Sequence, residues 1–213
     1  MVLKLHSAWR ASAPYRVRIG LNLKGVPYDY VPVDLVAGQQ QGPAYGAVNA
    51  QHLVPAIELE DGRVLTQSLS ILEWLEETHP EPALLPKAPL DRQVVRAMAA
   101  VVACDIHPLN NLRILKALAG LGVGEPQRNE WVHRWIGDGF AALERMVARH
   151  GGGYAFGDSP TLADCCLVPQ AYNAARFGVD MSPFPAISAA VARALEHPAI
   201  AAAHPNNQPD AVL

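Results

Sequence analysis

The sequence predicts a two-domain α+β protein in which a small α/β domain precedes an all-helical domain. Two features of the 213 residues support this fold class. Short strand-like segments alternate with helical ones only in the first eighty residues, whereas the remainder follows a helical pattern. Between the two halves, the segment HPEPALLPKAP holds four prolines in eleven residues, a density that interrupts helices and strands alike. We therefore predict an α/β domain at 1–80, a linker at 81–88 and a helical domain at 89–213.

The first domain begins with a strand and a helix. Val2–His6 is a short strand candidate. Pro14–Lys24 has the apolar spacing of a helix, and Gly25 is placed to end it. Val26–Val33 alternates apolar and polar residues, a pattern typical of a second strand.

A β-hairpin and a second helix complete this domain. Asp61-Gly62 is a strong hairpin signal, and the strand candidates Pro55–Glu60 and Arg63–Thr66 flank it. Apolar residues at helical spacing then predict a helix over Gln67–Thr78. The predicted order is β-α-β-loop-β-β-α.

Four helices are predicted in the second domain, and one of them starts with a capping signal. Their ranges are Leu90–Ala119, with a kink at Pro108, then Arg128–His150, Leu162–Phe177 and Ala186–Glu196. The pattern Thr161-Leu-Ala-Asp164 has the form of a capping box at the start of the third helix. We expect it to initiate the helix and to take no part in chemistry.

The bulk composition excludes several classes of function. The net charge of −3 gives no reason to expect nucleic acid or an anionic membrane as partner. No apolar run approaches the length needed to cross a bilayer, and the N-terminus is too short an apolar run for a signal peptide. The three cysteines fit neither a disulfide framework nor a zinc site. We expect a cytoplasmic protein with buried thiols and no metal.

The segment HSAWRASAPYRVR places three arginines and two serines around a strand-to-helix junction. Ser12 precedes the predicted helix, where its hydroxyl can donate to an anion or a thiolate, or can simply cap the helix. Arg10 lies in the loop, and a loop arginine is suited to bidentate binding of a carboxylate. Of the two helical arginines, Arg16 and Arg18, we expect one to be structural and one solvated.

Two further positions in the first domain suit a peptide-like ligand. Val54-Pro55 precedes a strand; the bond is either cis, which exposes the Val54 backbone for pairing, or trans at the first residue of an edge strand. Gln67-Ser68 opens a helix, and the free N–H groups of a helix start attract a carboxylate. The alternative is that Thr66 or Ser68 is a plain cap.

The second domain contributes candidate cations. Arg176 lies near the end of a helix, where it either binds an anion or compensates the helix dipole. His107 and Arg113 flank the expected kink at Pro108, and a kink in a long helix commonly borders a cleft. Cys104 lies three residues before His107, but no second pair of ligands at metal-site spacing accompanies them.

Taken together, these motifs resemble the glutathione transferases, with a thioredoxin-like N-terminal domain and an all-α C-terminal domain. More narrowly, SAWRASAPYRVRIGLNLKGV, HPLNNLRIL, GDSPTLADCCLVPQAYNAARFGVDM and PAIAAAHPNNQPDA are similar to the zeta class of that family. The resemblance covers essentially the whole chain. It implies glutathione as cofactor, a homodimer, and a small dicarboxylate keto-acid as substrate.

The resemblance also implies roles for individual residues. Ser12 would stabilise the glutathione thiolate, and Val54 would pair with the tripeptide backbone across a cis Pro55. The other implied glutathione contacts are Gln67 and Ser68 at the γ-glutamyl carboxylate and Gln40 and His52 nearer the glycyl end. Gln51 is a further implied glutathione contact, assigned to neither end. The implied substrate-binding residues are Arg10 and Arg176, which we count with Ser12 as catalytic, assisted by His107 and Arg113.

By resemblance, the reaction is a cis–trans isomerisation. The thiolate would add to the double bond of a maleyl keto-acid, the resulting single bond would rotate, and elimination would return the trans isomer. The family loop usually reads Ser-Ser-Cys, whereas this chain has Ala11, Ser12 and Ala13. The family's cysteine therefore has no counterpart here, and one serine must suffice.

Four functional hypotheses remain at this point. The departure at Ala11 and Ala13 favours maleylpyruvate, as in gentisate breakdown, over the maleylacetoacetate of tyrosine and homogentisate breakdown. A general glutathione-conjugating transferase would share the first step, but most such sites are apolar rather than rich in arginine. A binding protein without activity on the same fold is the fourth hypothesis.

Overall fold

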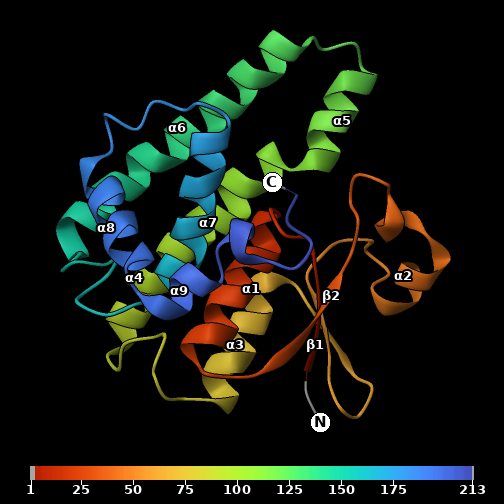
Figure 1. Ribbon diagram of the computed structural model, residues 1–213. Coiled ribbons are helices and arrows are strands. Elements are labelled where there is room, and N and C mark those ends of the chain that lie inside the picture. The colour runs from red at the N-terminus through yellow and green to blue at the C-terminus, as the bar shows by residue number, and fades with distance from the viewer. Residues whose placement is uncertain (1–2, 213) are drawn as a thin grey trace. The chain divides into compact units, whose positions relative to one another are not determined.

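The computed structural model describes residues 3–212, which form two compact units. The first unit extends to Leu84 and also includes the segment from His197 onward; the second unit is Leu85–Glu196. The sequence analysis assigned this C-terminal segment to the helical domain, whereas its contacts lie with the first unit (Figure 1). Val2, part of the predicted first strand, lies outside the described residues.

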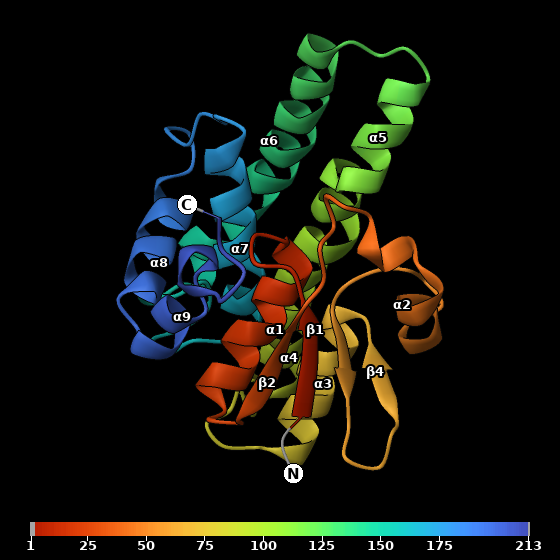
Figure 2. The ribbon, with the colours of Figure 1, turned by 45° about the vertical axis from the view of Figure 1, so that its right-hand side comes forward.

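A mixed four-stranded sheet organises the first unit (Figure 2). The strands are β1 (Leu3–Ser7), β2 (Tyr28–Pro32), β3 (Ala56–Glu58) and β4 (Val64–Thr66), in the spatial order β2-β1-β3-β4. Strand β1 pairs in parallel with β2 and antiparallel with β3, and β3 pairs antiparallel with β4. The predicted order of strands and helices in this half of the chain is confirmed.

Two helices pack against each other beside this sheet. They are α1 (Ser12–Leu23) and α3 (Ser68–Thr78), and both bury apolar side chains such as Ile19 and Leu72. The predicted loop between β2 and β3 contains a 3₁₀ turn, η1 (Gln39–Gln41), and a short helix, α2 (Pro43–Val48). The sequence pattern did not predict these two elements because neither shows a sustained helical period.

The C-terminal segment is bound to α1 by side chains that lie on that helix. It forms α9 (Pro198–Ala202) and the 3₁₀ turn η4 (Pro205–Asn207). Asn22 Nδ2 donates to the carbonyl of Ala199 at 3.0 Å, and Arg18 Nε donates to the carbonyl of Ala203 at 3.1 Å. These bonds explain why the segment belongs to the first unit rather than to the helical one.

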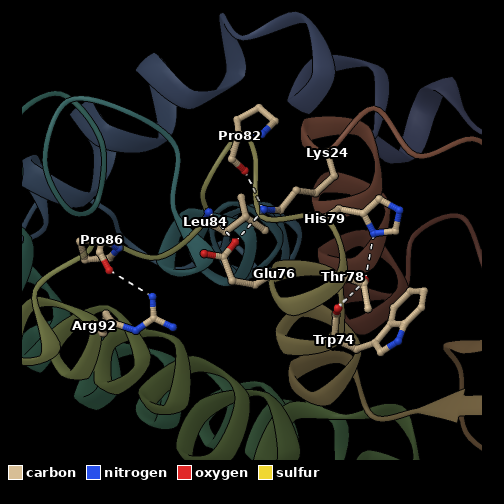
Figure 3. A network of polar contacts seen from close by, with 9 residues as sticks. All are labelled: Lys24, Trp74, Glu76, Thr78, His79, Pro82, Leu84, Pro86 and Arg92. Atoms are coloured by element: carbon tan, nitrogen blue, oxygen red, sulfur yellow. Dashed lines mark hydrogen bonds and ion pairs between the residues drawn. The ribbon is translucent and has the colours of Figure 1, made fainter.

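A buried ion pair also stabilises the first unit (Figure 3). Lys24 follows α1, and its Nζ lies 2.6 Å from Glu76 Oε2 of α3 and 2.6 Å from the carbonyl oxygen of Pro82. The same Glu76 oxygen accepts a hydrogen bond from the backbone N–H of Leu84 at 2.8 Å. The pair therefore joins the ends of two helices to the proline-rich segment that follows them.

In the second unit, the buried helix α7 (Leu162–Arg176) is central. It packs against α4 (Pro89–Ala100) and α8 (Pro185–Leu195), and α8 also packs against the long helix α6 (Glu125–His150). Every residue of α7 from Leu162 to Gln170 is buried. No helix within residues 3–212 is both long and apolar enough to cross a membrane.

The helix predicted over Leu90–Ala119 is not continuous, which corrects the sequence analysis. After α4 come a π-helical turn, η2 (Val101–Ile106), a 3₁₀ turn, η3 (His107–Asn110), and α5 (Leu112–Gly120). Pro108 has no N–H with which to continue the α-helical ladder, and the turns on either side of it depart from α geometry. The extended backbone of Asn111 then separates η3 from α5.

The predicted capping box at the start of α7 is confirmed. Asp164 accepts hydrogen bonds from the Thr161 backbone N–H at 2.8 Å and from the Thr161 hydroxyl at 3.0 Å. It also accepts from the backbone N–H of Ala155 at 2.8 Å, so it joins the preceding loop to the helix. Burial raises the pKa of Asp164 from 3.8 to about 6, although these hydrogen bonds act in the opposite direction.

This raised pKa predicts a pH-dependent contribution to stability. The folded state binds the Asp164 proton more tightly than the unfolded state does, so the stabilisation is complete below pH 3.8 and is lost as the pH rises through about 6. Asp164→Asn should remove this slope while lowering stability at every pH, because an amide nitrogen would face one of the N–H donors. Urea unfolding of both proteins between these pH values measures the slope; parallel curves would contradict the prediction.

Candidate functional site

Ser12 lies at the junction of β1 and α1, as its proposed role requires. It is the first residue of α1 and is 7% exposed. The cap position is occupied by Ala11, so the alternative reading of Ser12 as a plain cap is wrong. Ser12 therefore lies at the start of α1, where the first-turn N–H groups of the helix would stabilise a thiolate.

The loop before Ser12 carries Arg10 and is held in place by residues that the sequence analysis missed. Arg10 is exposed, and its guanidinium lies 5.5 Å from the centre of the Trp9 ring. The backbone of Trp9 is bound at both polar groups: its N–H donates to Asp210 Oδ2 at 3.1 Å, and its carbonyl accepts from Arg18 Nη2 at 2.7 Å. The loop that presents Arg10 and Ser12 is thereby anchored to the C-terminal segment and to α1.

Both helical arginines of α1 are buried, which corrects the expectation that one would be solvated. Arg18 is 0% exposed, and its Nη1 also donates to Ser7 Oγ at 3.0 Å. Burial lowers the pKa of Arg18 from its ordinary value. Arg16 is 2% exposed. Two charged residues two positions apart gave no sequence signal of burial, because helical patterns normally place charges on the solvent face.

The start of α3 has the properties of a carboxylate site. Gln67 occupies the cap position with φ of 67° and ψ of 113°, and no side chain caps the helix there. The readings of Thr66 or Ser68 as a plain cap are therefore wrong. A positive φ is uncommon for a residue other than glycine. The first-turn N–H groups of α3 are suited to an anion.

Side chains from elsewhere in the first unit meet this helix start. Gln67 Nε2 donates to Gln51 Oε1 at 2.8 Å. Ser68 is 6% exposed, and its Oγ accepts from Arg16 Nη1 at 3.2 Å. The structure thus joins two predicted contacts, Gln51 and Gln67, and adds Arg16, which the sequence analysis did not assign to the site.

Gln40 and His52, predicted near the glycyl end of glutathione, also lie together. His52 has a φ of 56°, and its Nδ1 lies 2.7 Å from the carbonyl oxygen of Gln40. Gly46 of α2 permits this approach, since a Cβ there would lie 2.8 Å from His52 Cε1. Among the described residues, Gln40 Oε1 is buried without a hydrogen-bond partner, so its amide retains capacity to bind a ligand.

The Val54–Pro55 peptide bond is cis. It immediately precedes β3, which lies between β1 and β4 and is therefore an internal strand. The alternative of a trans proline on an edge strand is wrong on both counts.

The candidate cations of the second unit come from three different elements. His107 begins η3, Arg113 is the second residue of α5 and is exposed, and Arg176 is the exposed last residue of α7. Arg176 Nη1 donates to Asn173 Oδ1 at 3.2 Å, and Asn173 Nδ2 donates to Asn110 Oδ1 at 3.3 Å. The arginine therefore lies at the end of a polar chain that joins α7 to η3. The sequence analysis missed both asparagines.

The three cysteines within residues 3–212 are free thiols. Cys165 and Cys166 are buried, but Cys104 is exposed, which corrects the expectation that the thiols are buried. In the same residues no group of three or more histidine, cysteine or acidic side chains is arranged to hold a metal ion.

Comparisons with known proteins agree with this arrangement. Residues 12–78 match the N-terminal domain of glutathione S-transferases, and residues 129–204 match the C-terminal domain. The chain is 46% identical to a maleylacetoacetate isomerase of Pseudomonas aeruginosa, over 98% of each chain.

Solved structures give the same result. One is the holo structure of a maleylpyruvate isomerase described as a bacterial zeta-class glutathione S-transferase, at 49% identity, a TM-score of 0.95 and coverage of 98% of this chain and all of the other. Another is a maleylacetoacetate isomerase of Anaeromyxobacter dehalogenans with glutathione bound in its active site, at 46% identity, a TM-score of 0.91 and coverage of 99% and 98%. The chain belongs to the glutathione S-transferase family, within its zeta class.

Proposed function

We propose that the protein is a glutathione-dependent cis–trans isomerase that converts maleylpyruvate to fumarylpyruvate. One observation carries the proposal: the first unit combines a buried Ser12 at the start of α1 with an uncapped start of α3 at Gln67 and Ser68. The first feature suits a thiolate and the second a carboxylate, and glutathione bears both groups. Gln40 Oε1, which is buried and has no hydrogen-bond partner within residues 3–212, is a further polar group that fits a bound peptide.

Bound glutathione would supply a thiolate that adds reversibly to the cis double bond, so that rotation occurs about a single bond before elimination restores the thiol. The residues of this chain would bind glutathione, stabilise its thiolate and orient the substrate. The Ser12 hydroxyl would donate to the sulfur and favour its anionic form. Val54 would pair its backbone with the peptide, next to the cis bond to Pro55, while Gln51, Gln67 and Ser68 would hold the γ-glutamyl end.

The substrate carries two carboxylates, which calls for cations. We assign them to Arg10 and Arg176, with His107 and Arg113 assisting. Both arginines are exposed. The Arg176 guanidinium is bonded to Asn173 Oδ1, and that of Arg10 lies over the Trp9 ring. Bidentate, charge-assisted hydrogen bonds would orient the double bond and favour the negative charge that develops on the ketone oxygen.

Maleylacetoacetate is the second candidate substrate, because relatives acting on either keto-acid are about equally similar to this chain. We prefer maleylpyruvate on the ground of Ala11 and Ala13, which replace the serine and the cysteine of the usual family loop. A conjugating transferase would leave glutathione attached to its product, and this difference in outcome separates the two classes of enzyme.

The proposal is tested by following purified protein with maleylpyruvate, with and without glutathione, and identifying the product. Formation of fumarylpyruvate that requires glutathione but consumes no thiol supports the isomerase. Net loss of thiol with an adduct indicates a conjugating transferase. Activity on maleylacetoacetate alone would show that maleylacetoacetate, and not maleylpyruvate, is the substrate. The absence of a reaction with either keto-acid would overturn the proposed function.

Arg176→Lys should impair turnover more than glutathione binding. Lysine keeps the charge but loses the planar fork that bonds both to Asn173 and to a carboxylate, so we expect kcat/KM for the keto-acid to fall by roughly tenfold. The matched control is Arg149→Lys at the exposed end of α6, which should leave the rate unchanged. An unchanged rate in Arg176→Lys would remove Arg176 from the site.

We also propose that the enzyme is a cytoplasmic homodimer, as the zeta-class likeness suggests. Sedimentation of the purified chain at several concentrations tests the dimer, and fractionation of the producing cells tests the location. A mass corresponding to one chain at all concentrations would overturn the first part.

A further inference from the structure

Arg16 has a contact that the proposed mechanism does not use. It lies on α1, one turn after Ser12, and its Nη1 donates to Ser68 Oγ at 3.2 Å. Both partners are more than nine-tenths buried, at 2% exposure for Arg16 and 6% for Ser68. The bond spans 52 residues of sequence and joins α1 to the first residue of α3.

This bond restricts what the Ser68 hydroxyl can do. A serine hydroxyl has one proton to donate and lone pairs with which to accept. Because a lone pair of Ser68 Oγ is engaged by the guanidinium, the hydroxyl proton is directed away from Arg16. The hydroxyl at the uncapped start of α3 is thereby set as a donor, which is the orientation that a bound carboxylate requires.

Arg16 also places a positive charge behind this hydroxyl. The charge is buried, so solvent and salt screen it much less than they screen an exposed charge. It adds to the partial positive charge of the helix start. An anion bound at Ser68 would therefore be attracted by a cation that does not touch it directly.

Arg18 shows that this arrangement is specific to one of the two buried arginines. Its three described hydrogen bonds go to Ser7 Oγ and to the carbonyls of Trp9 and Ala203. These bonds hold the loop and the C-terminal segment in place, so Arg18 has a structural role. Arg16 instead reaches the start of α3.

We propose that Arg16 is a positioning residue for the γ-glutamyl carboxylate of glutathione, acting through the Ser68 hydroxyl and through its buried charge. The inference rests on the proposed binding of glutathione. It makes Arg16 a determinant of specificity for peptides that carry this carboxylate, rather than for thiols in general.

The test compares two peptides by calorimetric titration of the full chain. One is glutathione and the other is 4-aminobutyryl-cysteinyl-glycine, which lacks only the γ-glutamyl carboxylate. Arg16→Met should raise the dissociation constant for glutathione by roughly tenfold or more while changing that for the analogue by less than about twofold. Arg16→Lys should give an intermediate loss, because it keeps a charge but not the fork.

Two further variants separate positioning from folding. In Arg18→Lys the ratio of the two dissociation constants should match wild type even if the melting temperature falls. Combining Arg16→Met with Ser68→Ala should cost less than the sum of the single losses, because the two residues act as one unit. If Arg16→Met does not fold, Arg16→Lys carries the same comparison of the two peptides.

The outcomes are distinguishable. Equal weakening of both peptides by the Arg16 variants would overturn the positioning role and leave glutathione binding intact. Additive losses with Ser68→Ala would also overturn it. Failure of the wild-type protein to bind glutathione would overturn the proposed function itself, and this inference with it.

Discussion

Ser12→Ala is expected to lower the isomerisation rate at neutral pH by roughly a hundredfold, because the thiolate loses its hydrogen-bond donor. Ser12 is the one hydroxyl in the Ala11-Ser12-Ala13 loop, and it lies buried at the first turn of α1. No neighbouring serine or cysteine in that loop can replace it.

The pH dependence of the rate tests whether Ser12 acts by stabilising the thiolate. A donor to the thiolate lowers the pKa of the bound thiol, so removing the donor raises that pKa. The rate of Ser12→Ala should therefore recover part of its loss as the pH rises, whereas the wild-type rate should level off at a lower pH. Rates at saturating glutathione and the ultraviolet absorbance of the bound thiolate measure the two effects separately.

Two companion variants control this experiment. Ser70→Ala changes an exposed serine on α3 and should leave both the rate and the thiolate absorbance unchanged. Ala13→Cys restores the cysteine of the usual family loop, and it should give no gain in rate if one serine suffices. A wild-type rate in Ser12→Ala at neutral pH would show that the thiolate is stabilised elsewhere.

Local signals in the sequence predicted the parts of the fold that local chemistry determines. Asp61-Gly62 specified the hairpin, and Thr161 with Asp164 specified the start of α7, since both depend on residues a few positions apart. The stretch around Pro108 was harder to predict. A proline predicts that the helix is interrupted. Whether the interruption is a kink or a succession of π and 3₁₀ turns depends on packing, which cannot be read from the sequence.

The contacts that hold the candidate site could not be predicted, because they join distant residues. Asp210 binds the Trp9 backbone across 201 residues, and Arg16 reaches Ser68 across 52. Predicted glutathione contacts such as Gln67 came from position at a helix start and from family resemblance. The residues that hold these contacts in place, such as Asp210 and Arg16, belong to no sequence motif. Because most arginines are exposed, the sequence alone does not show that an arginine in a helix is buried.

The buried ion pair of Lys24 and Glu76 is another contact between distant residues that the sequence did not predict. The Lys24 side chain is 0% exposed and that of Glu76 is 8% exposed, so the two charges are removed from water together. Lys24→Met would leave the Glu76 carboxylate buried without its cation and the Pro82 carbonyl without its donor. We expect the free energy of unfolding to fall by about 3–5 kcal/mol.

A double-mutant cycle separates the pair from its surroundings. Lys24→Met combined with Glu76→Leu removes both charges, so it should recover part of the stability lost in Lys24→Met alone. Recovery should be incomplete because the Leu84 N–H then loses its acceptor (Figure 3). The exposed pair of Arg63 and Asp61, 2.6 Å apart, is the control, and Arg63→Ala should leave the urea midpoint unchanged. If Lys24→Met lowered the free energy of unfolding no more than Arg63→Ala does, the prediction that burial strengthens the effect of this ion pair on stability would be wrong.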